Sequence, residues 1–131
     1  MARGERVAGA GRVPVRSYAR LARERVSGSP SAEERGVWIG VATWMLDTHA
    51  ARSLKDKRGI VTPIVERLRQ RYPVSVARLD HLDAYTSERL GMVVMNQDPA
   101  VCRQVLERAL AFVASFGHRT FDVTIDVERW D

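Results

Sequence analysis

Residues 52–58 read Arg-Ser-Leu-Lys-Asp-Lys-Arg, and this stretch decides the fold because strand-like sequence gives way to a helix here. Ser53 is a good N-cap residue, since its hydroxyl can accept a hydrogen bond from a free amide of the first turn. Asp56 follows three residues later and approximates a capping box, although Glu or Gln is the usual residue at that position. The stretch therefore predicts a helix that begins near Leu54.

The same helix start carries more positive charge than a helix N-terminus favours. Three cations follow the cap: Lys55, Lys57 and Arg58. The helix dipole is already positive at this end, so each of these charges is unfavourable by about 0.3–1 kcal/mol. A local rule that is broken without local compensation often marks a functional site. We expect this edge of the protein to meet an anion, most simply an RNA phosphate.

The helix is predicted over residues 54–71, with its apolar residues on one stripe. Lys57 falls on that stripe, one turn before Val61, so we expect its chain to lie along the core and its ammonium to reach the surface. Pro63 either kinks this helix or moves its true start to Thr62. The stripe consists of Leu54, Val61, Ile64, Val65 and Leu68.

Four further segments are predicted as strands: 37–46, 74–79, 88–95 and 121–127. The first is apolar on both faces, which indicates a central strand or one with a face against a partner subunit. The last alternates, with Phe121, Val123, Ile125 and Val127 on one face.

A second helix is predicted from Asp98-Pro99, an N-cap followed by proline at the first helical position, to residue 116. Gly117 is expected to end it in a left-handed conformation. The resulting order is βαββαβ, an α+β ferredoxin-like split βαβ fold. Right-handed crossovers give an antiparallel sheet with strand order 4-1-3-2 and both helices on one face.

The net charge of +5 is unevenly distributed over the 131 residues. Residues 1–35 hold eight Arg and four Glu, whereas residues 36–131 hold 13 basic and 12 acidic residues. We therefore expect a disordered Arg-rich leader over 1–35 and a single, nearly neutral domain over 36–131, not a broadly basic nucleic-acid binder. A basic arm for RNA or an acidic partner, or a start codon assigned too far upstream, would also account for the leader.

Composition excludes several classes of protein. A single cysteine, Cys102, rules out an internal disulfide or a Cys-rich zinc module and is expected to be a packed thiol. No apolar run approaches the ~20 residues of a membrane span, and no secretory signal is present. These features favour a cytoplasmic protein. No phosphate-binding loop, dinucleotide fingerprint or nucleophile elbow occurs, so we expect no cofactor.

The predicted topology brings three connections, residues 47–58, 80–87 and 117–119, to one rim of the sheet. Helix-end amides with Lys and Arg make a phosphate-binding rim, on which Tyr85 or a histidine could stack against a base. The expected RNA- or phosphate-binding residues are Arg52, Lys55, Lys57, Arg58, His81 and Arg119.

Three other interpretations of this rim remain open. Asp47, Asp80 and Asp83 could simply neutralise the bases as solvated pairs. His49, His81 and Asp83 could bind a metal, although they lack a dense ligand spacing. A small-ligand or metal-dependent enzyme centred on His81 and Asp83 is the corresponding catalytic interpretation, with Asp80-His81 as half of an acid–base pair.

Four segments are similar to a known family: WIGV at 38–41, ARSLKDKR at 51–58, VSVA at 74–77 and LGMVV at 90–94. They resemble the YlxP-like family of small bacterial proteins, whose domain has no known function, over about residues 37–128. The resemblance implies a ferredoxin-like fold, no established activity or cofactor, and genes often adjacent to those for transcription termination, translation initiation and ribosome maturation. Family members usually begin near Val37, so the leader departs from the pattern.

The resemblance and the cationic helix start together favour a non-enzymatic accessory factor in ribosome maturation or translation. Its expected partner is rRNA or a ribosomal particle. The alternative is a homo-oligomeric protein-interaction module without RNA contact, in which a homodimer forms through the open sheet face that carries Ile39, Val41 and Met45.

Overall fold

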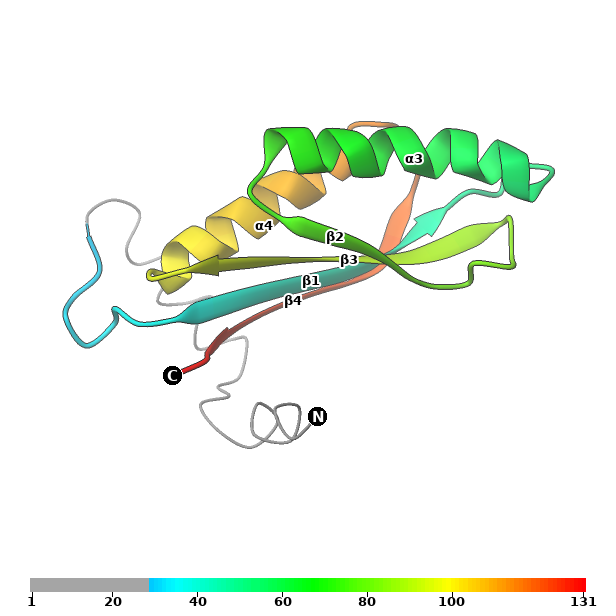
Figure 1. Ribbon diagram of the computed structural model, residues 1–131. Helices are drawn as coiled ribbons and strands as arrows, with labels where there is room; N and C mark the ends of the chain where they lie inside the picture. Colours follow the sequence, from blue (N-terminus) through cyan, green and yellow to red (C-terminus); the bar gives the residue numbers. More distant parts are fainter. Residues whose placement is uncertain (1–28) are drawn as a thin grey trace.

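The computed structural model describes residues 29–131, which form a four-stranded antiparallel sheet with two helices over one face (Figure 1). The elements are β1 (Trp38–Asp47), α3 (Leu54–Arg71), β2 (Ser75–Asp80), β3 (Ser87–Asn96), α4 (Pro99–Ala114) and β4 (Thr120–Arg129). The sheet order is β2-β3-β1-β4. The predicted βαββαβ order and the 4-1-3-2 arrangement are both confirmed.

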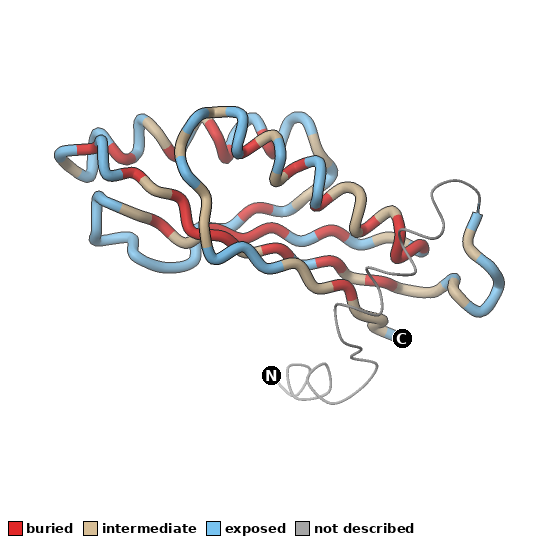
Figure 2. The backbone as a smooth tube through the Cα atoms, turned by 180° about the vertical axis from the view of Figure 1, so that it is seen from behind, coloured by how far each residue is buried: buried red, intermediate tan, exposed pale blue. Residues whose placement is uncertain are grey.

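The core lies between the sheet and the two helices, and β1 runs through its centre. Alternate residues of β1 face the helices and are buried, while Val41 on the opposite face is 38% exposed. Figure 2 shows this alternation of buried and exposed residues along the strands. The inward set from β1 consists of Trp38, Ala42, Trp44 and Leu46, and β3 adds Leu90, Met92 and Val94.

Helix α3 begins where the cap predicts. The amide of Asp56 donates to the Ser53 hydroxyl at 3.1 Å, which satisfies one of the free donors of the first turn. The helix continues through Pro63 to Arg71, so the alternative start at Thr62 is wrong. Ile64, directly after the proline, is buried in the core, and this packing outweighs the hydrogen bond that proline removes.

The start of α4 also follows the prediction, but the helix ends two residues earlier than predicted. Asp98 accepts from the amide of Ala100 at 2.9 Å as the N-cap. The helix ends at Ala114, and Gly117 adopts the expected positive φ of 89° three residues later.

Strand β4 contains a bulge that interrupts the predicted alternation. Its register against β1 shifts between Thr43 and Met45, and Asp122 has a φ of 49°. Phe121 consequently lies opposite Met45, and Val123 is 47% exposed. The prediction that one face carries all four apolar residues of this strand is therefore wrong in its first half.

The part of the expected leader that the structure describes, residues 29–35, contacts the domain. The indole N–H of Trp38 donates to the carbonyl of Glu34 at 2.5 Å, and the Arg129 guanidinium donates to the carbonyls of Glu33 and Arg35 at 2.9 Å. The predicted disorder of residues 1–28 lies outside the described residues. Neither α3 nor α4 has the length and apolar content that a bilayer-spanning helix requires.

Two glycines test the packing of the helices. A Cβ at Gly40 would lie 2.8 Å from Leu106 Cδ1 and 3.2 Å from Cys102 Cβ, because α4 crosses close above β1 there. We expect Gly40→Ala to lower the free energy of unfolding by about 1–3 kcal/mol through overpacking. In Gly59→Ala the added methyl meets nothing within 4 Å, and the residue is inside α3, so stability should rise by about 0.5–1 kcal/mol. Urea denaturation measures both changes, and equal effects would contradict this packing.

Candidate functional site

Hydrogen bonds join the three connections that were predicted to share one rim. The amide of Asp47 donates to the carbonyl of Arg119 at 2.8 Å, which ties the end of β1 to the start of β4. The amide of Thr48 donates to the carbonyl of Thr86 at 2.9 Å, and its hydroxyl donates to the carbonyl of Tyr85 at 2.8 Å. The predicted juxtaposition is therefore confirmed.

Lys57 does not reach the surface of this rim. Its side chain is 1% exposed, and its ammonium lies 3.0 Å from the Glu88 carboxylate, which is itself 0% exposed. The ammonium also donates to the carbonyl of His81 at 2.7 Å and to that of Ala84. Lys57 lies on the apolar stripe, as predicted. Its predicted contact with phosphate is wrong, because its ammonium is buried and bonded to three internal acceptors.

Glu88 binds a second cation, Arg78. The Arg78 Nε donates to one carboxylate oxygen at 2.6 Å, and Nη2 donates to the other. These bidentate hydrogen bonds to Glu88 raise the pKa of Arg78 above its ordinary value. Lys57, Glu88 and Arg78 thus form one buried ion network between α3, β2 and β3.

Glu88 and Arg78 were not among the predicted site residues. The signal for Glu88 is its register, since it lies opposite Leu46 on the side of β3 that faces the helices. A carboxylate on an inward strand position and a lysine on an inward helix stripe are natural partners, because a buried charge needs a counter-charge.

The other cations of the helix start point outward. Arg52, Lys55 and Arg58 are exposed. Among residues 29–131, no internal carboxylate forms an ion pair with any of the three; the nearest acid in sequence, Asp56, instead accepts from the backbone amide of Arg52 at 3.1 Å. These three residues, which we call the cationic turn, are the part of the predicted site that remains available to an external anion.

The rest of the predicted rim is partly neutralised. Asp47 lies 3.6 Å from Arg119, whose guanidinium also stacks 4.3 Å from the Phe121 ring centre. The pKa of Asp47 is lowered because it accepts from the amide of His49 and then from the His49 ring. The expected solvated pairing therefore holds for Asp47. The His81 side chain is exposed, and its backbone has a φ of 62°.

The metal and nucleophile interpretations gain no geometric support. Within residues 29–131, no three His, Cys, Asp or Glu side chains are grouped closely enough to hold a metal ion, including His49, His81 and Asp83. Cys102 is 0% exposed in the core, and burial raises its thiol pKa to about 11. It is a packed thiol, as expected.

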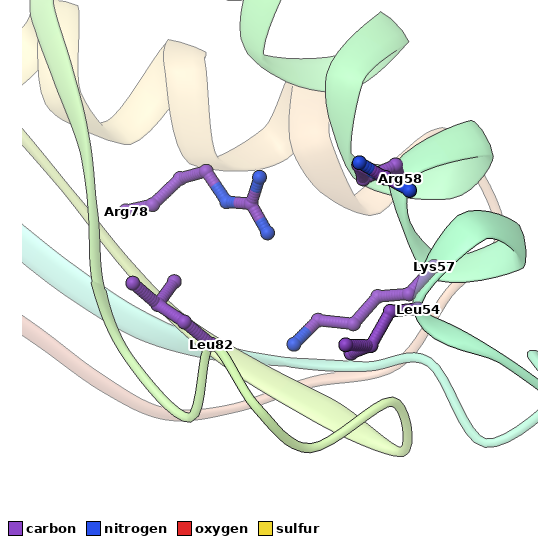
Figure 3. Close-up of a pocket in the computed structure, with 5 residues that line it drawn as sticks. All are labelled: Leu54, Lys57, Arg58, Arg78 and Leu82. Carbon is purple, nitrogen blue, oxygen red and sulfur yellow. The ribbon is translucent and has the colours of Figure 1, made fainter.

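A pocket of about 320 Å³ opens between the first turn of α3 and the connection from β2 to β3 (Figure 3). Lys57 and Arg78 point toward each other from opposite sides of it, and Leu82 lies below Arg78. Its lining combines aliphatic and cationic side chains: Leu54, Lys57, Arg58, Arg78 and Leu82.

The fold and this rim define a small ferredoxin-like α+β protein with a cationic helix start over a buried ion network. The family described as "Protein of unknown function (DUF503)" matches residues 39–125, more than half of the chain, and the protein belongs to this family. It is also similar to "Uncharacterized protein YlxP" of Bacillus subtilis (strain 168), with 28% identity over 78 residues that cover 60% of this chain and 85% of that protein. The resemblance to YlxP-like proteins is thereby confirmed.

Among solved structures, the chain is similar to a C-terminal segment of the alpha subunit of aIF2 from Pyrococcus abyssi. The TM-score is 0.40 at 11% identity, and the match covers 73% of this chain and about half (52%) of that one. A likeness this distant carries no argument about function.

The ion network makes a specific prediction about stability. Lys57→Met leaves Glu88 buried with Arg78 as its remaining partner, and we expect the free energy of unfolding to fall by about 3 kcal/mol. The matched control Lys55→Met removes an exposed lysine from the same turn and should change stability by less than about 0.5 kcal/mol. Adding Glu88→Gln to Lys57→Met also removes the carboxylate that binds Arg78, so the double variant should be less stable than Lys57→Met alone. Equal effects of the two lysine variants in urea would show that Lys57 is not buried.

Proposed function

We propose that the protein is a non-enzymatic accessory factor that contacts RNA through the cationic turn. The observation that carries this proposal is the exposure of Arg52, Lys55 and Arg58 without carboxylate partners among the described residues. Positive side chains beside the free amides of a helix N-terminus provide a binding site for phosphate. The charge that is unfavourable for the isolated helix becomes favourable when a polyanion is bound.

The charge of the open sheet face supports the rim as the nucleic-acid surface. On that face, Arg89 is accompanied by two acids of β4, Asp126 and Glu128, which line a common hollow with it. Carboxylates line this hollow, whereas no carboxylate of residues 29–131 pairs with the cations of the cationic turn. The exposed Tyr85, 45% accessible on the connection after β2, lies at the rim and offers a ring for base stacking.

The gene neighbourhood implied by the family resemblance supports a ribosomal context for this contact. We therefore propose rRNA or a ribosomal precursor particle as the partner and the cytoplasm as the location. The proposal includes Arg119 and His81 as flanking contacts and no longer includes Lys57.

The proposal predicts a salt-dependent affinity for ribosomal RNA fragments. Replacing Lys55 and Arg58 together with Ala removes two phosphate contacts, so the plot of log K against log salt should become shallower by about 1.4–1.8. Filter binding or fluorescence anisotropy of the full chain measures this slope. The wild type and the variant carry the same Arg-rich leader, so binding by the leader cancels in the comparison.

The control is Arg108→Ala, since Arg108 is an exposed cation on α4. Loss of one charge there should leave the salt slope unchanged when the cationic turn is the site. An equal change in slope for both proteins, or no measurable RNA affinity in the wild type, would refute the proposal.

A second candidate function is self-association through the open sheet face. Val41, Val93 and Leu79 are 38%, 37% and 47% exposed, and they line a hollow of about 300 Å³ on that face. Met95, on the same face of β3, is 68% exposed. A contiguous exposed apolar area is typical of a protein interface, and a second copy of this chain would bring the same surface to it.

Sedimentation of the full chain over a range of concentrations tests this candidate. We expect Val93→Lys to shift the protein toward the monomer, because a charge would be buried in the interface. Ala111→Lys, an exposed position on α4, is the matched control and should not change association. A wild type that stays monomeric at the highest concentration would rule the candidate out.

A further inference from the structure

We propose that the pocket between α3 and the β2–β3 connection binds a single unstacked nucleotide, with its base between Leu54 and Leu82 and its phosphate on Arg58 and Arg78. The inference rests on the RNA contact proposed above and names the unit of RNA that the site takes.

The cationic side of the pocket has hydrogen-bond donors that could bind a ligand. Lys57 and Glu88 satisfy each other at 3.0 Å and are closed to solvent. Arg78 uses Nε and Nη2 on Glu88, its side chain is 36% exposed and lines the pocket, and no described residue accepts a hydrogen bond from its Nη1. With Arg58, which has no ion-pair partner among residues 29–131, the pocket presents two guanidinium groups, and guanidinium donors match the oxygens of a phosphate.

The other side of the pocket is aliphatic and exposed to water. Leu54 is 44% and Leu82 is 50% exposed, and the two come from different elements that face the same hollow. A planar base inserted between them would remove apolar surface from water on both of its faces. The volume of about 320 Å³ is sufficient for one such group, since small-ligand pockets begin at about 300 Å³.

The wall that carries Leu82 is held in place before any ligand arrives. The Lys57 ammonium bonds the carbonyls of His81 and Ala84, which lie on either side of Leu82 in the chain. The amide of Ala84 also donates to the carbonyl of His81 at 3.2 Å. A preformed wall lowers the entropy lost on binding.

The surroundings of the pocket favour a nucleotide within a chain over an isolated carboxylate. Arg52 and Lys55 are exposed beside Arg58 in the same turn, outside the pocket. They would meet the phosphates that flank the bound nucleotide. The carboxylate of a peptide C-terminus would engage only the pocket, and these two charges would have no role.

The test compares two RNA hairpins that differ in one residue: one has a single unpaired uridine or adenosine in its stem, and the other is fully paired. We expect the full chain to bind the bulged hairpin about ten-fold more tightly, which corresponds to about 1.4 kcal/mol. The double variant Leu54→Ala/Leu82→Ala should lose this preference while it keeps its affinity for the paired hairpin. Met95→Ala, an exposed apolar residue on the open sheet face, is the matched control and should keep the preference.

The outcomes distinguish a failure of this inference from a failure of the proposed function. Equal affinity for both hairpins, or a preference that survives in the double leucine variant, overturns the nucleotide pocket and leaves the RNA contact intact. Absence of binding to either hairpin overturns both. Free uridine or adenosine monophosphate that binds as tightly as the bulged hairpin, and is lost in the same variant, supports the pocket chemistry and identifies a free nucleotide as its source.

Discussion

The end of the molecule where the rim lies depends on one buried charge, the ammonium of Lys57. An isolated ammonium in the interior would be highly unfavourable, and it is retained here because Glu88 and two loop carbonyls surround it. Together with Lys57 in α3, these partners in β3 and in the β2–β3 connection belong to three different parts of the chain. The requirement to satisfy one cation therefore fixes how α3, β3 and the β2–β3 connection meet, more specifically than apolar contacts alone would.

This network explains why one of the three cations that follow the cap of α3 is tolerated there. Three positive residues at a helix N-terminus look uncompensated when only neighbouring residues are considered. Lys57 is in fact compensated by Glu88, a residue 31 positions later, whereas Lys55 and Arg58 are not compensated within the described chain. A single basic cluster thus contains a structural residue and functional candidates, separated by the 100° step between successive helix positions.

The fold could be predicted from the sequence because the helix caps and the apolar patterns indicate the same elements. The Ser53 cap and the apolar stripe set the bounds of α3, and the Asp98-Pro99 pair sets the start of α4. The bulge at Asp122 could not be predicted, since a register shift depends on the pairing of two strands and not on the pattern of one. The pocket escaped prediction for a related reason: Leu54 and Leu82 are distant in sequence, and only the folded connection places them together.

The open sheet face and the cationic turn differ in charge, and the two proposed contacts therefore use separate surfaces. The open sheet face combines apolar residues with the acids of β4, and the cationic turn lies at the end of the sheet instead of on it. An apolar face can bury against another protein, while a phosphate backbone requires the basic end. Because the surfaces do not overlap, binding at one leaves the other open. Two strands connect the Lys57 network to the open sheet face: β2 carries Arg78 next to Leu79, and β3 carries Glu88 at its start and Met95 near its end.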